Sequence, residues 1–169
     1  MKKKLVIVTV LCLAAGTLAV VFLVTLQRHN LKRARIVQLP AFEARDIEGG
    51  TFVSSSLSRY RRSAILFFSP DCEFCRTELK NIVMRGNQWE DVCWLFVTMS
   101  DKTTVEDFLM ECDVEAIPNS RVVIDEKGSI ISLFAVSAPP TLFIYDENLL
   151  LIHIGKGATS ISTIMEWLQ

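Results

Sequence analysis

The chain has 169 residues, of which 50% are hydrophobic, and a formal net charge of −1 at pH 7. This length fits one domain with an appendage. All 19 acidic residues lie at Glu43 or later, and only 11 of the 18 basic residues lie beyond Ile36, so the C-terminal part is acidic. An acidic domain without a basic stripe argues against nucleic-acid binding.

The first 26 residues have the pattern of a membrane anchor. Residues 1–4 form a basic N-terminus, and residues 5–26 carry no charge. As a helix rising about 1.5 Å per residue, residues 5–26 span roughly 33 Å, enough for a hydrocarbon core of about 30 Å. A cleaved signal peptide is the alternative, but its apolar region is usually only about 7–15 residues long. The sequence therefore predicts one N-terminal transmembrane helix, an uncleaved signal anchor.

Residues 27–39 are predicted to form a basic juxtamembrane linker. Arg28, Lys32, Arg33 and Arg35 lie in it, where they can meet anionic head groups. They balance the three lysines and the amine of the N-terminus, so the positive-inside rule leaves the orientation open. A single compact domain is expected at residues 40–169.

The first half of this domain is predicted to alternate strands with helices. Residues 42–53 favour a short hairpin that turns at Gly49-Gly50. The continuous apolar runs 63–69 and 92–100 predict two buried strands. Residues 72–84 lie between them and predict a helix, because apolar residues recur on one of its faces.

The second half repeats this pattern and adds a hairpin. A helix is expected at 104–112, a strand at 121–124 and a short helix at 129–134. Two strands at 141–145 and 149–154 are followed by a last helix that Thr159 or Ser160 begins. The sequence therefore predicts an α/β fold with a mixed sheet covered on both faces.

Two cysteines stand where a strand turns into a helix. Cys72 follows the turn Pro70-Asp71 and is expected at the helix N-terminus, where free N–H groups and the helix dipole favour a thiolate. A thiolate attacks disulfides through a mixed disulfide. Cys75 lies one turn further on the buried face and is placed to resolve that intermediate.

Two structural alternatives remain open for this pair. Half a zinc site needs two more ligands, for which Cys93, Cys112 and His153 are the candidates, and none forms a second Cys-x-x-Cys pair. A purely structural disulfide would constrain the unfolded chain little, because the loop is so short. Cys93 and Cys112 favour buried core thiols, and a disulfide between them is a further alternative.

The stretch FFSPDCEFCRTE resembles the active site of the thioredoxin superfamily, most closely that of the membrane-anchored TlpA/ResA-like thiol–disulfide oxidoreductases. The stretch FAVSAPPTLFIY resembles the family's segment that ends in a cis-proline and a threonine. The resemblance covers most of residues 40–168 and implies a thioredoxin-like fold. It places a proton-handling glutamate at Glu78, the cis-proline at Pro140 and the following threonine at Thr141.

The sequence departs from this family at three positions. Asp71 replaces the usual tryptophan, and with Glu73 it puts two carboxylates beside Cys72, which oppose thiolate formation and favour a reductant over a strong oxidant. Leu66 replaces the buried aspartate of cytosolic thioredoxins, so Glu78 is expected to move the proton unless it is a solvated carboxylate paired with Arg76 or Lys80. Pro139 offers no backbone N–H to a substrate.

The expected function is thiol–disulfide exchange with protein substrates. Cys72 is the expected nucleophile, Cys75 the resolving thiol, Glu78 the proton handler and Pro140 the docking element. Substrate docking is further expected at Asp71, Glu73, Phe74, Pro139 and Thr141. No cofactor or metal is expected beyond the redox-active Cys72–Cys75 pair.

The resemblance also implies a cellular setting. It suggests a single-pass protein of the bacterial inner membrane that faces the periplasm or the cell exterior. There it would reduce protein disulfides, for example in cytochrome c maturation, and would be recycled by a membrane electron donor.

Two other functions remain as alternatives. A thiol peroxidase of the superfamily usually has a serine or threonine and a proline ahead of its cysteine; Ser69 fits, but Ile65 occupies the proline's place. A binding module with idle cysteines is the second alternative.

Overall fold

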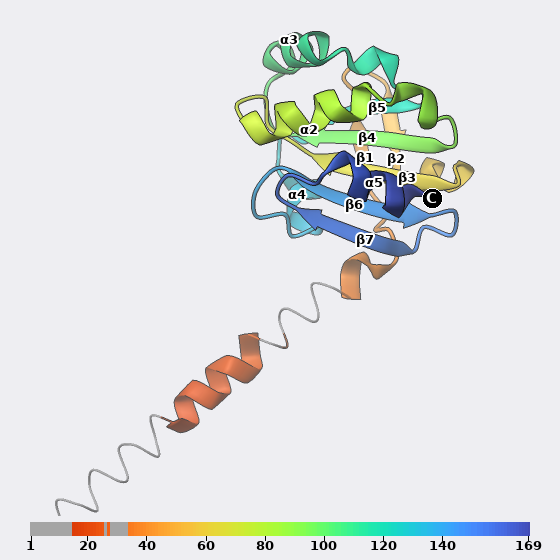
Figure 1. Ribbon diagram of the computed structural model, residues 1–169. Coiled ribbons are helices and arrows are strands. Elements are labelled where there is room, and N and C mark those ends of the chain that lie inside the picture. Colours follow the sequence, from red (N-terminus) through yellow and green to blue (C-terminus); the bar gives the residue numbers. More distant parts are fainter. Residues whose placement is uncertain (1–14, 26, 28–33) are drawn as a thin grey trace, which may run out of the picture. The chain divides into compact units, whose positions relative to one another are not determined.

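The computed structural model describes residues 15–25, 27 and 34–169 (Figure 1). The chain divides into two units, Met1–Ala34 and Arg35–Gln169. Residues 15–25 are helical, and Thr25 Oγ1 donates hydrogen bonds to the carbonyls of Val21 and Phe22 at 3.0 and 2.8 Å. Within the described residues no helix has both the length and the apolar character needed to cross a membrane. Residues 5–14 and 26 of the predicted anchor, and 28–33 of the predicted linker, lie outside the described residues.

The second unit is built on a five-stranded mixed sheet with the strand order β5-β4-β3-β6-β7. β3, β4 and β5 are parallel, whereas β6 and β7 are antiparallel to their neighbours. A separate hairpin of β1 and β2 precedes the sheet. The elements in chain order are β1 (Glu43–Arg45), β2 (Thr51–Val53), η1 (Ser54–Arg59), β3 (Arg62–Phe67), α2 (Glu73–Val83), η2 (Gly86–Gln88), β4 (Val92–Thr98), α3 (Lys102–Cys112), η3 (Val114–Ala116), β5 (Ser120–Ile124), α4 (Ser129–Leu133), β6 (Thr141–Asp146), β7 (Leu151–Lys156) and α5 (Ile161–Leu168).

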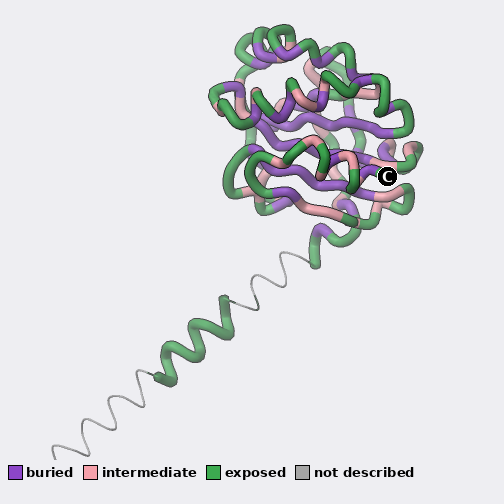
Figure 2. The backbone as a smooth tube through the Cα atoms, viewed as in Figure 1, coloured by how far each residue is buried: buried purple, intermediate pink, exposed green. Residues whose placement is uncertain are grey.

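The central strands are buried on both faces, which explains their continuous apolar sequences. Figure 2 shows these strands as the buried interior of the domain. One core lies between the sheet and helices α2, α3 and α5, and it contains Leu66, Trp94 and Phe96. The other lies between the sheet and the elements β2, η1 and α4, and it contains Phe67 and Phe134. The predicted α/β fold with a mixed sheet covered on both faces is therefore confirmed.

The compact domain begins at Arg35, five residues before the predicted boundary. Ile36 and Leu39 are buried in the second core. The hydroxyl of Tyr145 donates a hydrogen bond to the Ile36 carbonyl at 3.0 Å, and the Leu39 N–H donates to the Leu149 carbonyl at 2.8 Å. Residues 35–39 of the predicted linker are thus part of the folded domain, because their apolar side chains cover its core.

Most predicted elements are observed, with shifted ends. The hairpin turns at Gly49 (φ +91°), where the Gly49 N–H donates to the Asp46 carbonyl at 2.9 Å. Ser160 begins α5, because its hydroxyl accepts the Thr163 N–H at 3.2 Å. The three 3-10 helices η1, η2 and η3 were not predicted, because such short helices carry no apolar periodicity.

Candidate active site

Cys72 lies immediately beyond the carboxyl end of β3. Its N–H donates to the Ser69 carbonyl at 3.1 Å and so closes a tight turn around Pro70. The guanidinium of Arg76 holds this turn from the other side, donating to the Pro70 carbonyl at 3.1 Å. Cys72 is the N-cap of α2, and its sulfur accepts the Cys75 N–H at 3.2 Å. The local sequence thus places one sulfur at the positive end of a helix, where the N–H group stabilises a thiolate.

The two cysteines have different surroundings. Cys72 is half-buried, whereas Cys75 is completely buried beneath the first turn of α2. Burial raises the pKa of the Cys75 thiol to about 12, and the hydrogen bond with the Cys72 side chain and the nearby charge of Cys72 add to the rise. Cys72 is therefore the more accessible thiol of the pair, and Cys75 is the one that holds its proton more tightly.

Glu78 lies behind the pair, one turn further along α2. Only 2% of it is exposed. Burial raises the pKa of its carboxyl group to about 7, although the Thr159 N–H, which donates to Oε2 at 3.2 Å, acts in the opposite direction. The Oε1 atom is buried without a hydrogen-bond partner. The charge of Glu78 also contributes to the raised pKa of Cys75, so the two groups interact electrostatically inside the domain.

The alternative in which Glu78 is a solvated carboxylate is wrong. Lys80 donates instead to Glu111 on α3 at 3.0 Å, and Arg76 also binds Glu111. The guanidinium of Arg76 additionally lies 5.1 Å from the Phe108 ring centroid. Both bases of α2 are held on the outer side of the helix, so neither neutralises the buried carboxyl group.

The segment that contains the predicted cis-proline lies against Cys72. The Pro139–Pro140 peptide bond is cis, as predicted. Cys72 Sγ lies 3.9 Å from the Pro139 carbonyl oxygen. The Pro140 carbonyl accepts the Gly157 N–H at 2.9 Å. The segment before β6 and the cysteine pair thus form one surface, although they are 67 residues apart in the sequence.

The predicted docking residues divide into two groups. Asp71, Glu73, Phe74 and Pro139 are exposed around Cys72. Thr141 is buried, and its hydroxyl donates to the Ala138 carbonyl at 2.7 Å. The side chain of Thr141 therefore fixes the loop before β6 and does not face a substrate, since its hydroxyl is occupied inside the domain.

A largely apolar cavity of about 400 Å³ opens beside the pair. The ends of β3 and β4, α4 and the segment before Pro140 form its walls. Its lining includes Ser69, Met99, Val136, Ala138 and Pro139. Ser69 and Pro139 also contact Cys72, so the cavity adjoins the reactive sulfur.

The remaining described cysteines lie apart from each other. Cys93 belongs to the core beneath β2, η1 and α4, whereas Cys112 belongs to the core beneath α2, α3 and α5. Both are free thiols on opposite faces of the sheet, so they form neither the alternative disulfide nor a shared zinc site with Cys75. In the part of the chain that the structure describes, no three His, Cys, Asp or Glu side chains are grouped as metal ligands.

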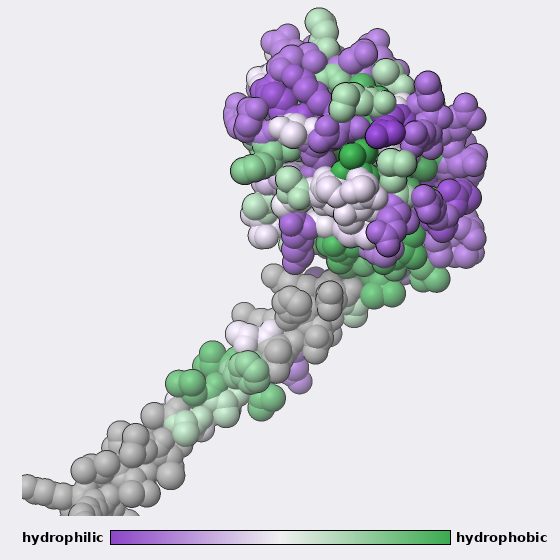
Figure 3. All heavy atoms as spheres, viewed as in Figure 1, coloured by the Kyte–Doolittle hydropathy of each residue, from purple (hydrophilic) through white to green (hydrophobic). Residues whose placement is uncertain are grey.

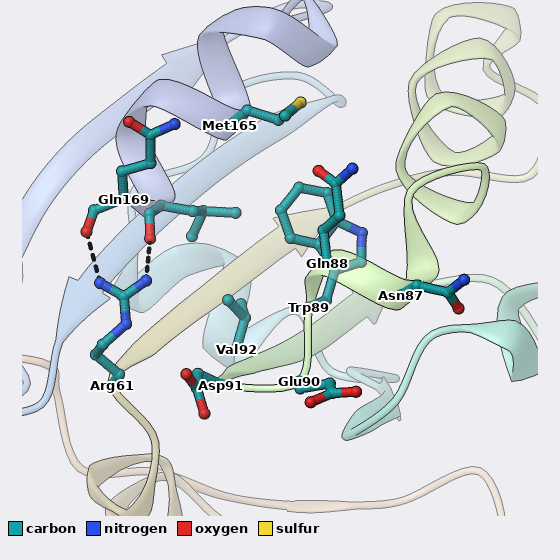
Figure 4. Close-up of a pocket in the computed structure, with 10 residues that line it drawn as sticks. Arg61, Asn87, Gln88, Trp89, Glu90, Asp91, Val92, Met165 and Gln169 are labelled. Atoms are coloured by element: carbon teal, nitrogen blue, oxygen red, sulfur yellow. Dashed lines mark hydrogen bonds between the residues drawn. The ribbon is translucent and has the colours of Figure 1, made fainter.

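A second cavity, of about 290 Å³, lies at the opposite end of the sheet, where β3 and β4 begin (Figure 4). Arg61 spans one side of it. Its guanidinium donates to the Leu168 carbonyl at 2.8 Å and to the Gln169 carbonyl, which fixes the end of α5 (Figure 4).

Sequence reasoning missed Thr159 as a residue of the site. It was considered only as a helix cap, yet its backbone N–H binds a carboxylate 81 residues earlier in the chain. A backbone contact over this distance leaves no side-chain signature in the sequence.

Comparison with solved structures identifies the fold. The chain is 18% identical to dsbF of Mycobacterium tuberculosis, with a TM-score of 0.68 over 80% of this chain and 95% of that one. It is 19% identical to StoA from Bacillus subtilis (TM-score 0.63, covering 79% and 99%). It is 13% identical to the peroxidoxin BcpB from M. tuberculosis (TM-score 0.64, covering 78% and 91%). These structures share the thioredoxin-like fold.

The fold and its family define a thioredoxin-like oxidoreductase. The chain belongs to the AhpC/TSA family, whose sequence model matches residues 37–154. No curated protein of matching sequence was found.

Proposed function

We propose that this protein is a thiol–disulfide oxidoreductase that reduces disulfide bonds of other proteins through Cys72 and Cys75. One observation carries the proposal. The accessible sulfur of Cys72 accepts the Cys75 N–H at a helix N-terminus, while Cys75 itself is buried and interacts electrostatically with the buried Glu78. This arrangement separates a nucleophile from a resolving thiol within one helical turn.

The reaction proceeds in two exchanges. The Cys72 thiolate attacks one sulfur of a substrate disulfide, which forms a mixed disulfide and releases the other sulfur as a thiolate. Cys75 then loses its proton and attacks the Cys72 sulfur, so that the substrate's second sulfur leaves. Two electrons pass to the substrate, which ends as two thiols once protonated, and the protein ends with a Cys72–Cys75 disulfide. A dithiol donor must then reduce this disulfide.

Glu78 receives the proton of Cys75 in the second exchange. Its pKa of about 7 makes it an effective base at neutral pH, because a general base works best when its pKa lies near the working pH. The free Oε1 atom can accept this proton, since it has no other hydrogen bond. The proton can later return when the disulfide is reduced.

Substrate docking uses the exposed rim of the pair. Phe74 is 69% exposed on the first turn of α2, and the cavity lined by Met99 and Pro139 opens on the other side of Cys72. Both surfaces suit apolar side chains that flank a substrate disulfide. Pro139 supplies a carbonyl but no N–H, so a docked strand gains fewer backbone hydrogen bonds here.

The proposal extends to the cellular setting. The uncharged run at residues 5–26 and the basic residues after it support a single-pass anchor in the bacterial inner membrane. We infer that the domain faces the periplasm or the cell exterior and that a membrane dithiol donor reduces it. Reduction of protein disulfides during cytochrome c maturation fits this setting.

A thiol peroxidase is the second candidate, because the fold is also that of the peroxidoxin BcpB and the family is AhpC/TSA. Ser69 stands three residues before Cys72, as in such peroxidases. Ile65, however, is a completely buried residue of β3 where they carry proline.

Disulfide reduction by the purified full-length chain tests these functions. We expect the reduced protein to reduce insulin disulfides and the Cys72→Ser variant to be inactive. Peroxide consumption without insulin reduction would indicate the peroxidase. A wild-type protein with neither activity would contradict both and leave a binding module.

A further inference from the structure

The connection between β7 and α5 joins two parts of the active site. The Gly157 N–H donates to the Pro140 carbonyl at 2.9 Å, and the Thr159 N–H donates to Glu78 Oε2 at 3.2 Å. Ser160 then begins α5. Residues 155–160 therefore set the position of the only hydrogen-bond donor that the structure gives to the carboxyl group of Glu78.

Gly155 of β7 is the residue against which Thr159 of this connection packs. A Cβ atom at Gly155 would lie 2.6 Å from Thr159 Oγ1 and 3.2 Å from Cζ3 of Trp167. Real Cβ atoms do not approach to 2.6 Å, so a side chain here must displace the Thr159 hydroxyl. The φ of Gly155 is not positive, and its backbone continues the ladder opposite Leu142 of β6. Glycine is thus required for space and not for an unusual backbone conformation.

Helix α5 is held against the same strand. The ring of Trp167 stacks on His153 of β7 with a centroid distance of 5.0 Å and an interplanar angle of 7°. A Cβ at Gly155 would thus meet Thr159 on one side and the Trp167 ring on the other. It would press on Thr159, whose backbone carries the N–H bound to Glu78.

From this geometry we propose that Gly155 is a positioning residue for proton transfer, because it admits Thr159 against β7 and so keeps the Thr159 N–H on Glu78. The proposal rests on the proposed role of Glu78 as the base for Cys75. It extends the residues needed for proton transfer to Gly155 of β7, outside the helix that carries the two cysteines.

The electrostatic surroundings make this hydrogen bond important. Burial raises the pKa of Glu78, and the Thr159 N–H is the group that lowers it. On α2, Cys75 interacts electrostatically with Glu78, while Arg76 and Lys80 are bound to Glu111. Residues 157–160 carry no charged side chain, the only one of α5 is the exposed Glu166, and Lys156 of β7 is exposed. Loss of the N–H would therefore raise the pKa of Glu78 further.

The test compares the pH dependence of disulfide exchange by the reduced full-length chain. The rate of release of the second product thiol from a small neutral disulfide should rise with pH near 7 in the wild type, as Glu78 loses its proton. Gly155→Ala should shift this rise upward by about one pH unit, which is about a tenfold loss of rate at the foot of the curve.

Three further variants decide the cause of the shift. Gly155→Ala combined with Thr159→Ala removes the conflicting hydroxyl but keeps the N–H, so the rise should return to its wild-type pH. In a Glu78→Gln background, Gly155→Ala should leave the remaining pH dependence unchanged. Gly50→Ala is the matched control, because a Cβ there meets no atom within 4 Å.

Several results would overturn the proposal. A folded Gly155→Ala protein with the wild-type profile would contradict it, and so would a shift that persists in the Glu78→Gln background. If Gly155→Ala does not fold, the Gly155→Ala, Thr159→Ala double variant decides. A rate that rises only at a higher pH than in the wild type would contradict the steric conflict with the Thr159 hydroxyl. A rate that rises at the wild-type pH would support it. A wild-type chain that reduces no disulfide at any pH would instead refute the proposed function itself.

Discussion

Cys72 and Cys75 have different surroundings although they lie within one helical turn. Cys72 is half-exposed and accepts an N–H at the start of α2, whereas Cys75 has no exposed surface. Burial raises the pKa of Cys75 to about 12, so in the proposed reaction this thiol needs a base. The neighbouring Glu78 has the pKa that such a base requires, about 7.

The buried carboxyl group of Glu78 makes the stability of the fold depend on pH. Because its pKa is raised in the folded state, the unfolded chain loses this proton at lower pH, and folding becomes less favourable as pH rises from about 4.5 to about 7. We predict that Glu78→Gln stabilises the reduced protein at pH 8 by about 2–3 kcal/mol relative to its effect at pH 5. Denaturant unfolding of both proteins at both pH values measures this difference. An equal effect at pH 5 and pH 8 would show that Glu78 ionises normally.

Phe74 is predicted to act on substrates and not on stability. Its ring is 69% exposed, so Phe74→Ser should change the free energy of unfolding by less than about 0.5 kcal/mol. If Phe74 packs on protein substrates, KM for insulin should rise about tenfold, while the rate with a small disulfide stays the same. Met84→Ser is the matched control, because Met84 is 74% exposed at the other end of α2. An unchanged KM in Phe74→Ser would exclude the contact.

Helix α4 supports the apolar cavity beside Cys72 and depends on one carboxylate. The buried Asp125 accepts hydrogen bonds from the N–H groups of Ser129, Ile130 and Ile131, each at 2.9 Å. The Ser129 hydroxyl donates a fourth at 3.0 Å. The Asp125 carboxylate thus binds the first three N–H groups of α4 and the hydroxyl of its first residue.

We predict that Asp125→Ala lowers the free energy of unfolding by about 2–4 kcal/mol, because several charge-assisted hydrogen bonds are lost together. Chemical denaturation measures the loss. Asp125→Asn should lose less, since its amide oxygen still accepts. A loss below about 1 kcal/mol in Asp125→Ala would mean that α4 is held by its apolar contacts alone.

The strands and long helices could be predicted from the sequence because their patterns are local. The apolar run that ends at Phe68 and the helical face of Cys75 and Leu79 both follow from neighbouring residues. The boundary at Arg35 could not be predicted, because Ile36 is recognisable as a core residue only through its contact with Tyr145. The 3-10 helices η1, η2 and η3 have the same difficulty.

The site was predictable to the extent that its residues are adjacent in the sequence. Cys72 and Cys75 follow from their spacing, and Glu78 and Pro140 were assigned by resemblance. The burial of Thr141 was missed, because its hydroxyl binds a carbonyl only once the loop is folded. The requirement at Gly155 was missed for the same reason: it depends on the packing of Thr159 and Trp167.

Within the domain, the reactive site and the start of the folded chain lie at opposite ends of the sheet. Cys72 follows the end of β3, whereas residues 38 and 39 pair with the turn after β6, near the start of β3. Six residues of β3 separate the two ends by about 20 Å. Figure 3 shows apolar residues gathered at the lower end of the domain, and Val37 and Leu150 are exposed where the chain enters it.

The proposed anchor gives a prediction for the whole protein. The full-length chain should stay in the membrane fraction after carbonate washing, because residues 5–26 hold it there. A membrane-impermeant thiol reagent added to intact cells should label Cys72, and Cys72→Ser should lose this label. Release by carbonate would contradict the anchor, and labelling only after lysis would contradict the external orientation.

Capture of the reaction intermediate tests the central claim most directly. In a Cys75→Ser variant of the full-length chain the first exchange can occur, but the second cannot. Mass spectrometry under non-reducing conditions should find a substrate cysteine joined to Cys72, and the adduct should vanish in the Cys72→Ser, Cys75→Ser double variant. An adduct on Cys93 or Cys112 instead, or none after incubation with a protein disulfide, would contradict the account.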